Sequence, residues 1–230
     1  MAEVVLALDL PSEAEAMRLL ERIPGTPWVK VGSVLATREG SPLVRALVAR
    51  GYQVFLDLKW HAIPNTVAGA VRAARELGVS MATVHALGGR TMMEAATEAA
   101  GGALALVGVT VLTSHDEGSY GRAVGRDGVG LEEEVARLAD EALAAGLAGV
   151  VCSPAEIKVV RRVLPDGALV VVPGIRSAAD SPGDQVRIAS ASAAAGAGAT
   201  HLVVGRPILE AADPAAALAR LTVEADCVSS

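Results

Sequence analysis

The chain has 230 residues, a length that fits one ordinary domain or one α/β barrel. Hydrophobic residues make up 52% of it and charged residues 20%, which excludes a disordered, coiled-coil or collagen-like protein. Because 20 basic residues face 26 acidic ones, the net charge is −6, and we expect neither nucleic acid nor an anionic membrane as a partner.

The cysteine content and the N-terminus bear on localisation. Cys152 and Cys227 are too few for a disulfide framework, and neither belongs to a CxxC motif. The sequence MAEVVLALDL lacks the basic start of a signal peptide, and the longest nearly apolar run, residues 101–112, is shorter than the ~18 residues that suggest a membrane span. We therefore expect a cytoplasmic protein.

Short runs rich in Val, Leu and Ile alternate with longer stretches of helical character. This pattern is typical of strands buried on both faces of a parallel sheet. The runs cover residues 4–8, 28–31, 53–58, 81–85, 103–109, 149–152, 169–172 and 201–204. Eight strands with intervening helices predict an α/β protein with one domain over residues 1–230, a (β/α)₈ TIM barrel.

Helix-start signals support the alternation. Ser12 with Glu15 forms a capping box, and the pairs Ser41-Pro42 and Ser153-Pro154 place a cap before a proline. The starts of the fifth and sixth runs are 46 residues apart, which leaves a polar, glycine-rich loop over residues 113–130 as a candidate lid. The alanine-rich residues 189–199 predict a helix packed on the barrel. A doubly wound nucleotide fold is disfavoured, because no GxGxxG follows the first run and GxxxxGK[ST] is absent.

Polar residues gather where the first four predicted strands end. The carboxyl ends of barrel strands face the mouth, where such enzymes carry out their chemistry. The residues are Asp9, Lys30, Asp57, Lys59 and His85. Because side chains alternate along a strand, Asp57 and Lys59 should share one face and point into the barrel. One Asp–Lys pair is more often a structural ion pair, but four charges from three neighbouring strands favour a catalytic site.

The segments after the last two strands have a different character. They contain PGIR at residues 173–176, GDQ at 183–185 and GRP at 205–207. Loops at this place in barrels commonly bind phosphate through backbone N–H groups and an arginine. Gly205 would let a phosphate approach the backbone, and Arg206 would clamp it with two hydrogen bonds. GRP alone is a common turn, but a second Gly/Arg loop beside it favours a phosphate site.

The segment FLDLKWHAIPNT, residues 55–66, resembles the DxKxxDIPNT signature of the orotidine 5′-phosphate decarboxylase family. The pieces ALD (7–9), VKVG (29–32), TVHALGG (83–89), GVTVLTS (108–114), VCS (151–153), PGIR, GDQ and VVGRPI (203–208) follow in the family's order. The resemblance covers about residues 7–214. Each piece alone is weakly specific, whereas their combination is strongly so.

The resemblance implies a decarboxylase that forms uridine 5′-monophosphate from orotidine 5′-monophosphate in pyrimidine biosynthesis. It implies no metal or organic cofactor, and a homodimer with a shared active site. By position, Lys59 would protonate C6 of the pyrimidine as carbon dioxide leaves, Asp57 would lie near the substrate carboxylate, and Lys30 would hold the charged network and the ribose. This is chemically coherent, because a fixed ammonium stabilises the carbanion left at C6.

The same resemblance implies contacts along the rest of the nucleotide. Asp9 would contact the ribose or the base, Thr113 the pyrimidine edge, and Thr66 the ribose bound by the partner subunit. The nucleotide and phosphate end would be formed by Arg176, Gln185, Gly205 and Arg206, with Gln185 also reaching the base.

One position departs from the signature. The chain has Ala62 where the family has an aspartate that reaches across the dimer, alternates with the two lysines and contacts the ribose. We expect its absence to impair turnover more than binding. Natural divergence, an engineered substitution and a replacement acid elsewhere all stay open.

Two rival functions follow from these features. One is a sugar-phosphate enzyme of the same barrel superfamily that uses a DxK pair with magnesium, against which the LTS and IPNT segments argue. The other is a uridine-nucleotide-binding relative that has lost turnover, which Ala62 keeps open. A zinc enzyme is disfavoured, because the histidines 61, 85, 115 and 201 lack metal-binding spacing.

Overall fold

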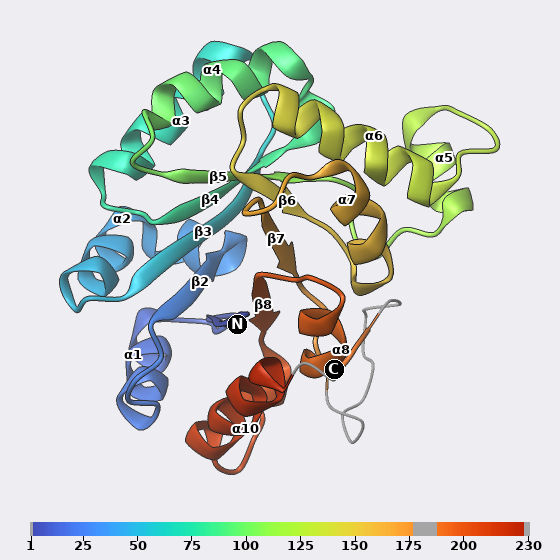
Figure 1. The fold of residues 1–230 in the computed structure, drawn as a ribbon. Coiled ribbons are helices and arrows are strands. Elements are labelled where there is room, and N and C mark those ends of the chain that lie inside the picture. The colour runs from blue at the N-terminus through green and yellow to red at the C-terminus, as the bar shows by residue number, and fades with distance from the viewer. Residues whose placement is uncertain (1, 177–187, 228–230) are drawn as a thin grey trace.

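Eight parallel strands close into a barrel in the order β1-β2-β3-β4-β5-β6-β7-β8 (Figure 1). The computed structural model describes residues 2–176 and 188–227. The strands are β1 (Glu3–Ala7), β2 (Trp28–Gly32), β3 (Gln53–Trp60), β4 (Met81–His85), β5 (Ala105–Val109), β6 (Gly149–Val151), β7 (Leu169–Val172) and β8 (His201–Val204). Because β8 also pairs with β1, the sheet is closed, and the predicted (β/α)₈ barrel is confirmed.

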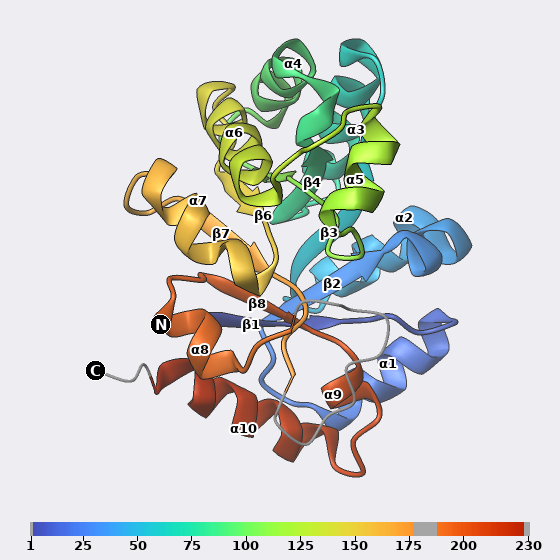
Figure 2. The ribbon, with the colours of Figure 1, turned by 90° about the vertical axis from the view of Figure 1, so that its right-hand side faces the viewer.

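Helices surround the barrel (Figure 2). They are α1 (Glu13–Arg22), α2 (Ser33–Ala49), α3 (Pro64–Glu76), α4 (Arg90–Ala100), α5 (Glu117–Val124), α6 (Leu131–Ala144), α7 (Ile157–Val163), α8 (Ala191–Gly196), α9 (Arg206–Leu209) and α10 (Pro214–Asp226), with short 3₁₀ turns η1 (Ala86–Gly88) and η2 (Pro154–Glu156). In the part of the chain that the structure describes, no helix combines the length and the apolar character needed to cross a membrane.

The helix starts agree with most of the sequence signals. The Ser12 side chain accepts a hydrogen bond from the backbone N–H of Glu15 at 3.3 Å, so the predicted cap of α1 is confirmed. Helix α2 begins at Ser33, earlier than Ser41 predicts. Gly40, with φ 63° and ψ −152°, interrupts this helix, and Pro42 lies in the first turn after the break. Proline fits there because the backbone N–H groups of a first turn have no partner within the helix, so the N–H that proline lacks is not needed.

The segment 113–130 is more structured than a polar loop. Helix α5 occupies its middle, and Asp116 caps that helix by accepting the Ser119 N–H at 2.7 Å. The buried Tyr120 donates its hydroxyl to Glu134 of α6 at 3.0 Å, and Arg126 also bonds Glu134. Gly118 and Gly121 lie inside this helix and Gly125 is its C-cap, so the glycine content argues locally against a helix that the cap and the contacts with Glu134 nevertheless stabilise.

The barrel interior changes from apolar to polar along its axis. The inward-facing apolar cluster consists of Val5, Ala7, Trp28, Phe55, Met81, Val107, Val171 and Val203. At the amino-terminal end the Trp28 and His201 rings meet edge to face, with centroids 5.2 Å apart. Because inward positions recur every two residues, Lys30, Asp57 and Thr83 follow Trp28, Phe55 and Met81 one layer closer to the mouth. The strands therefore place a polar layer on top of an apolar floor.

Candidate active site

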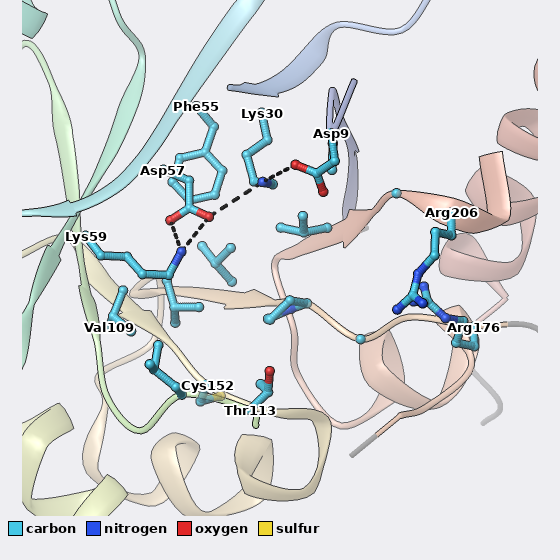
Figure 3. A pocket seen from close by; sticks show the side chains of 18 of the residues that line it. Asp9, Lys30, Phe55, Asp57, Lys59, Val109, Thr113, Cys152, Arg176 and Arg206 are labelled. Carbon is cyan, nitrogen blue, oxygen red and sulfur yellow. Dashed lines mark hydrogen bonds and ion pairs between the residues drawn. The ribbon is translucent and has the colours of Figure 1, made fainter. Parts of the chain in front are cut away.

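A pocket of about 700 Å³ opens at the carboxyl ends of the strands (Figure 3). The predicted site residues that line it are Asp9, Lys30, Asp57, Lys59, Thr113, Arg176, Gly205 and Arg206. Cys152 also lines it and is 1% exposed. Gln185 lies outside the residues that the structure describes. The eight residues lie in, or shortly after, six different strands, and the closed sheet brings them to one cavity.

The four predicted charges form a chain of alternating sign. Lys30 Nζ lies 3.1 Å from Asp9 Oδ1 and 3.6 Å from Asp57 Oδ2. Lys59 Nζ donates to both Asp57 oxygens, at 2.9 and 3.0 Å. Two ammonium groups thus alternate with two carboxylates along one wall of the pocket, which is the convergence predicted from the strand ends.

The Asp57 carboxylate is ionised despite its burial. Burial alone would raise its pKa, but the charges of Lys30 and Lys59, with hydrogen bonds from Lys59 and Thr83, lower the pKa below the ordinary aspartate value. The Asp57 side chain is 14% exposed and the Lys59 side chain 39%. The site therefore holds a fixed anion beneath an ammonium group that remains open to the pocket.

Lys59 reaches Asp57 by a different route from the one that strand alternation predicts. Among the non-glycine residues of the described chain, Lys59 alone has positive φ, at 50°. The pairing of β3 with β4 also shifts register between Leu56 and Trp60. An irregularity of this kind re-aims a side chain, and here it places the lysine over the pocket. The predicted neighbours are correct, whereas the regular strand geometry behind the prediction is not.

Two further residues shape the site and were not predicted. The Thr83 hydroxyl accepts the Lys59 backbone N–H at 2.7 Å and donates to Asp57 Oδ1 at 3.1 Å. At Gly32 a Cβ atom would lie 3.1 Å from Lys30 Nζ, so glycine leaves room for the lysine head group. The even spacing of Thr83 after Met81 is a signal that would have identified it as inward-facing.

Two arginines line the pocket at a distance from the carboxylates (Figure 3). Arg176 follows β7, is 6% exposed, and donates to the carbonyl of Ile175 at 3.0 Å. Arg206 begins α9 directly after Gly205. A Cβ atom on Gly205 would lie 3.5 Å from Oδ2 of Asp9, which also lines the pocket. The missing side chain of Gly205 therefore leaves its backbone accessible from the pocket. This end suits an anion, because guanidinium groups bind phosphate oxygens in pairs.

The segment between β3 and α3 forms an exposed rim. Ala62 and Thr66 are exposed, and neither lines this chain's pocket. Ile63, the N-cap residue of α3, is 70% exposed. The structure therefore brings neither Ala62 nor Thr66 to the site formed by their own chain.

The structure places His85 at the strand end where it is predicted, the end of β4, but apart from the pocket. Its ring stacks on His61 with centroids 5.5 Å apart, and its Nδ1 accepts the Leu87 N–H at 3.3 Å. Burial, with the charges of His61 and Lys59, lowers the pKa of His85 to about 4. Across residues 2–176 and 188–227, no three His, Cys, Asp or Glu side chains are grouped as metal ligands would be.

Comparisons with known proteins agree with this geometry. The sequence model of the orotidine 5′-phosphate decarboxylase/HUMPS family matches residues 2–221. The chain is 52% identical over 225 residues to orotidine 5′-phosphate decarboxylase of Halorhodospira halophila, covering 96% of this chain and 94% of that protein. It is 50% identical over 227 residues to the enzyme of the same name from Alkalilimnicola ehrlichii, covering 97% and 96%.

The fold has a solved counterpart. The crystal structure of orotidine 5′-phosphate decarboxylase from Lactobacillus acidophilus superposes with a TM-score of 0.87 at 36% identity, covering 99% of this chain and all of that one. The similarity in sequence and in structure spans the whole barrel, including every strand that contributes a pocket residue. This chain therefore belongs to the orotidine 5′-phosphate decarboxylase/HUMPS family.

Proposed function

We propose that this protein converts orotidine 5′-monophosphate into uridine 5′-monophosphate and carbon dioxide, a step of pyrimidine nucleotide synthesis. The observation that carries the proposal is one pocket with the Asp9–Lys30–Asp57–Lys59 chain at one end and two arginines at the other. A substrate with a carboxylated base at one end and a phosphate at the other matches these two ends of the pocket. The named relatives support this choice of substrate.

The chemistry assigned to Lys59 is stabilisation followed by proton transfer. Cleavage of the bond between C6 and the carboxylate carbon leaves its electron pair on C6 and releases carbon dioxide. The Lys59 ammonium stabilises that carbanion and then donates a proton to C6, giving the product. The amine left behind takes a proton from water, which restores the site without any other reactant.

Asp57 has two proposed roles. Its carboxylate fixes the Lys59 ammonium through contacts of 2.9 and 3.0 Å, so that little reorganisation is needed when negative charge develops. It also lies where the resemblance puts the substrate carboxylate, and repulsion between two anions would be relieved as carbon dioxide leaves. Lys30, between Asp9 and Asp57, holds this arrangement and contacts the ribose.

The remaining assignments concern binding. Asp9 contacts the ribose or base, and Thr113 contacts the pyrimidine edge. Arg176, Gly205 and Arg206 bind the phosphate end, together with Gln185, which also reaches the base. Binding energy from the phosphate holds the base against Lys59, which lowers the barrier to reaction at a distant carbon. No metal or organic cofactor takes part in this proposal.

We also propose that two copies form a homodimer in the cytoplasm. Exposed large hydrophobic side chains, namely Val34, Ile63, Leu87 and Leu112, follow β2, β3, β4 and β5 in turn. They therefore lie beside one another along one sector of the barrel mouth, and such a surface favours a protein partner. A second copy seated there would bring Thr66 to its neighbour's site.

A second candidate function is nucleotide binding without turnover. The observation in its favour is Ala62, an exposed methyl group where the family signature has a carboxylate. The metal-dependent sugar-phosphate enzyme remains the other alternative, since the matching family has a second name, HUMPS, beside the decarboxylase.

The deciding experiment is an assay for uridine 5′-monophosphate formation from orotidine 5′-monophosphate, with and without a chelator. We expect product formation that the chelator does not reduce. Tight product binding without turnover would favour the binding protein, and turnover of a sugar phosphate that the chelator abolishes would favour the metal-dependent enzyme.

A further inference from the structure

Thr83 is an inward-facing residue of β4 that lies below the mouth of the barrel. It is 0% exposed, so its hydroxyl has no access to water. A buried hydroxyl without partners is costly, and this one uses both its donor and its acceptor capacity. It accepts the Lys59 N–H at 2.7 Å and donates to Asp57 Oδ1 at 3.1 Å.

These two bonds complete a closed ring. Starting from the Lys59 backbone, the ring passes through the Thr83 hydroxyl to the Asp57 carboxylate and returns through the Lys59 ammonium at 2.9 Å. Both ends of the lysine are therefore held by β3 and β4, although its side chain has four rotatable carbon bonds. The ring fixes where the ammonium lies.

The backbone of Lys59 needs such support. Its φ of 50° lies in the left-handed region, which a residue with a Cβ atom rarely occupies. The register shift between Leu56 and Trp60 removes Lys59 from the regular β3–β4 ladder, and the Thr83 hydroxyl takes up its N–H. A strained conformation persists where its surroundings hold it from several directions.

We propose that Thr83 is a positioning residue that sets the Lys59 ammonium and the Asp57 carboxylate at the reacting carbon. The proposal rests on the proposed function, because the reacting carbon is that of the nucleotide base. Thr83 is fully buried and does not line the pocket, so we assign it no contact with the substrate. Its removal should therefore lower kcat and leave the affinity for the phosphate-bearing product nearly unchanged.

The test compares Thr83→Val, which keeps the shape and removes the hydroxyl, with Thr83→Ser, which keeps the hydroxyl. We expect Thr83→Val to lower kcat by about 10²-fold, the loss that a small misplacement of a reacting group can cause. KM and the dissociation constant of uridine 5′-monophosphate should change by less than about threefold, since the arginine end is untouched. Thr83→Ser should keep kcat within about threefold of the parent chain.

A matched control lies at the other end of the barrel. The Thr200 hydroxyl also accepts a backbone N–H, from Val170 at 2.9 Å, and donates to the Val170 carbonyl at 3.1 Å. Thr200→Val makes the same chemical change away from the pocket. If the threonine hydroxyls matter only for folding, both valine variants should lose thermal stability and neither should lose kcat.

Three outcomes would overturn the proposal: an unchanged kcat in Thr83→Val, an equal loss in Thr83→Ser, or a parallel loss of kcat and product affinity. If the parent chain forms no uridine 5′-monophosphate, the proposed function fails, and crystal structures of the parent and Thr83→Val decide separately on Thr83. We expect the valine variant to lose the positive φ at residue 59 or the Lys59–Asp57 contact. Retention of both would refute the positioning role.

Discussion

At the scale of single residues, we expect Ala62 to have the largest consequence for activity. It lies exposed on the rim after β3, so a larger side chain there meets no packed neighbour. Lys59 and Asp57 keep their contacts with alanine at this position. The proposed proton donor therefore keeps its partner, while the acid that the family signature has at position 62 is replaced by alanine.

We predict that Ala62→Asp raises kcat at least about tenfold, which corresponds to ~1.4 kcal/mol of transition-state stabilisation. The alanine itself should cost on the order of 10²–10⁴ in turnover, the range for removing a preorganised electrostatic group. Steady-state kinetics with orotidine 5′-monophosphate measures the change, and Ala62→Asn is the control for shape without charge. If aspartate leaves kcat unchanged, another acid fills the role or the alignment of residues 55–66 is wrong.

Arg206 belongs to the same scale. We predict that Arg206→Ala weakens binding of uridine 5′-monophosphate by ~2–4 kcal/mol, because a charge-assisted, two-point contact with phosphate is lost. Titration calorimetry measures the affinity, and Arg220→Ala, on α10 beyond the pocket, serves as the control. The fold should remain intact in both variants. An Arg206 variant with parent-like affinity would remove this residue from the phosphate site.

At the scale of secondary-structure elements, the sequence predicts the regular parts well. The eight buried runs, the cap at Ser12 and the converging charges are correct, because burial on both faces and alternation leave a clear pattern in the residues. The departures occur where a tertiary contact overrides a local rule. The Thr83 hydroxyl supports a left-handed Lys59, and the Glu134 carboxylate anchors α5 through Tyr120.

A similar reason explains why His85 lies at a predicted strand end without lining the pocket. A strand end tells which edge of the barrel a residue occupies but not which side of the strand its ring takes. His85 follows Thr83 by two positions, yet its ring turns towards the Leu87 N–H and His61 outside the pocket. Such a local hydrogen bond to the next turn has no signature in the spacing of the residues.

At the scale of the whole molecule, the hydrophobic sector of the mouth predicts how two copies meet. We predict that Val34→Glu gives a monomer with little activity, because a charge buried at a contact between copies is unfavourable. Val34 is 68% exposed, and Val223 on α10 is 62% exposed. Val223→Glu therefore makes the same change at an equally open valine outside the sector. It should leave assembly unaltered.

Light scattering at the concentration of the assay measures both variants. A Val34→Glu protein that is dimeric would contradict the assigned contact surface. A fully active monomer would show instead that the site is not shared between subunits.

His201, buried at the amino-terminal end of the barrel, makes the stability of the fold depend on pH. Burial lowers the pKa of His201 from 6.5 to about 4. The unfolded chain therefore takes up a proton first as the pH falls, and the folded state loses stability between pH 6.5 and 4. We predict that His201 accounts for about 2 kcal/mol of the loss between pH 7 and 5.

Urea unfolding at the two pH values measures this effect. His201→Gln should reduce that difference by about 2 kcal/mol, whatever its effect on stability at pH 7, and should leave the comparable contribution of His85, whose pKa is also lowered to about 4. An unchanged difference in the variant would mean that His201 is protonated in the folded barrel at pH 5.

Closure of the barrel has a consequence for contacts with other chains. Each of the eight strands has a neighbour on both sides, so the sheet offers no unpaired backbone edge to which a strand of another molecule could add. In the proposed dimer, recognition between copies would then depend on the loops and helices that surround the sheet. A point substitution on the exposed surface of the barrel mouth can therefore change which chain binds there, while the hydrogen bonds of the closed sheet remain the same.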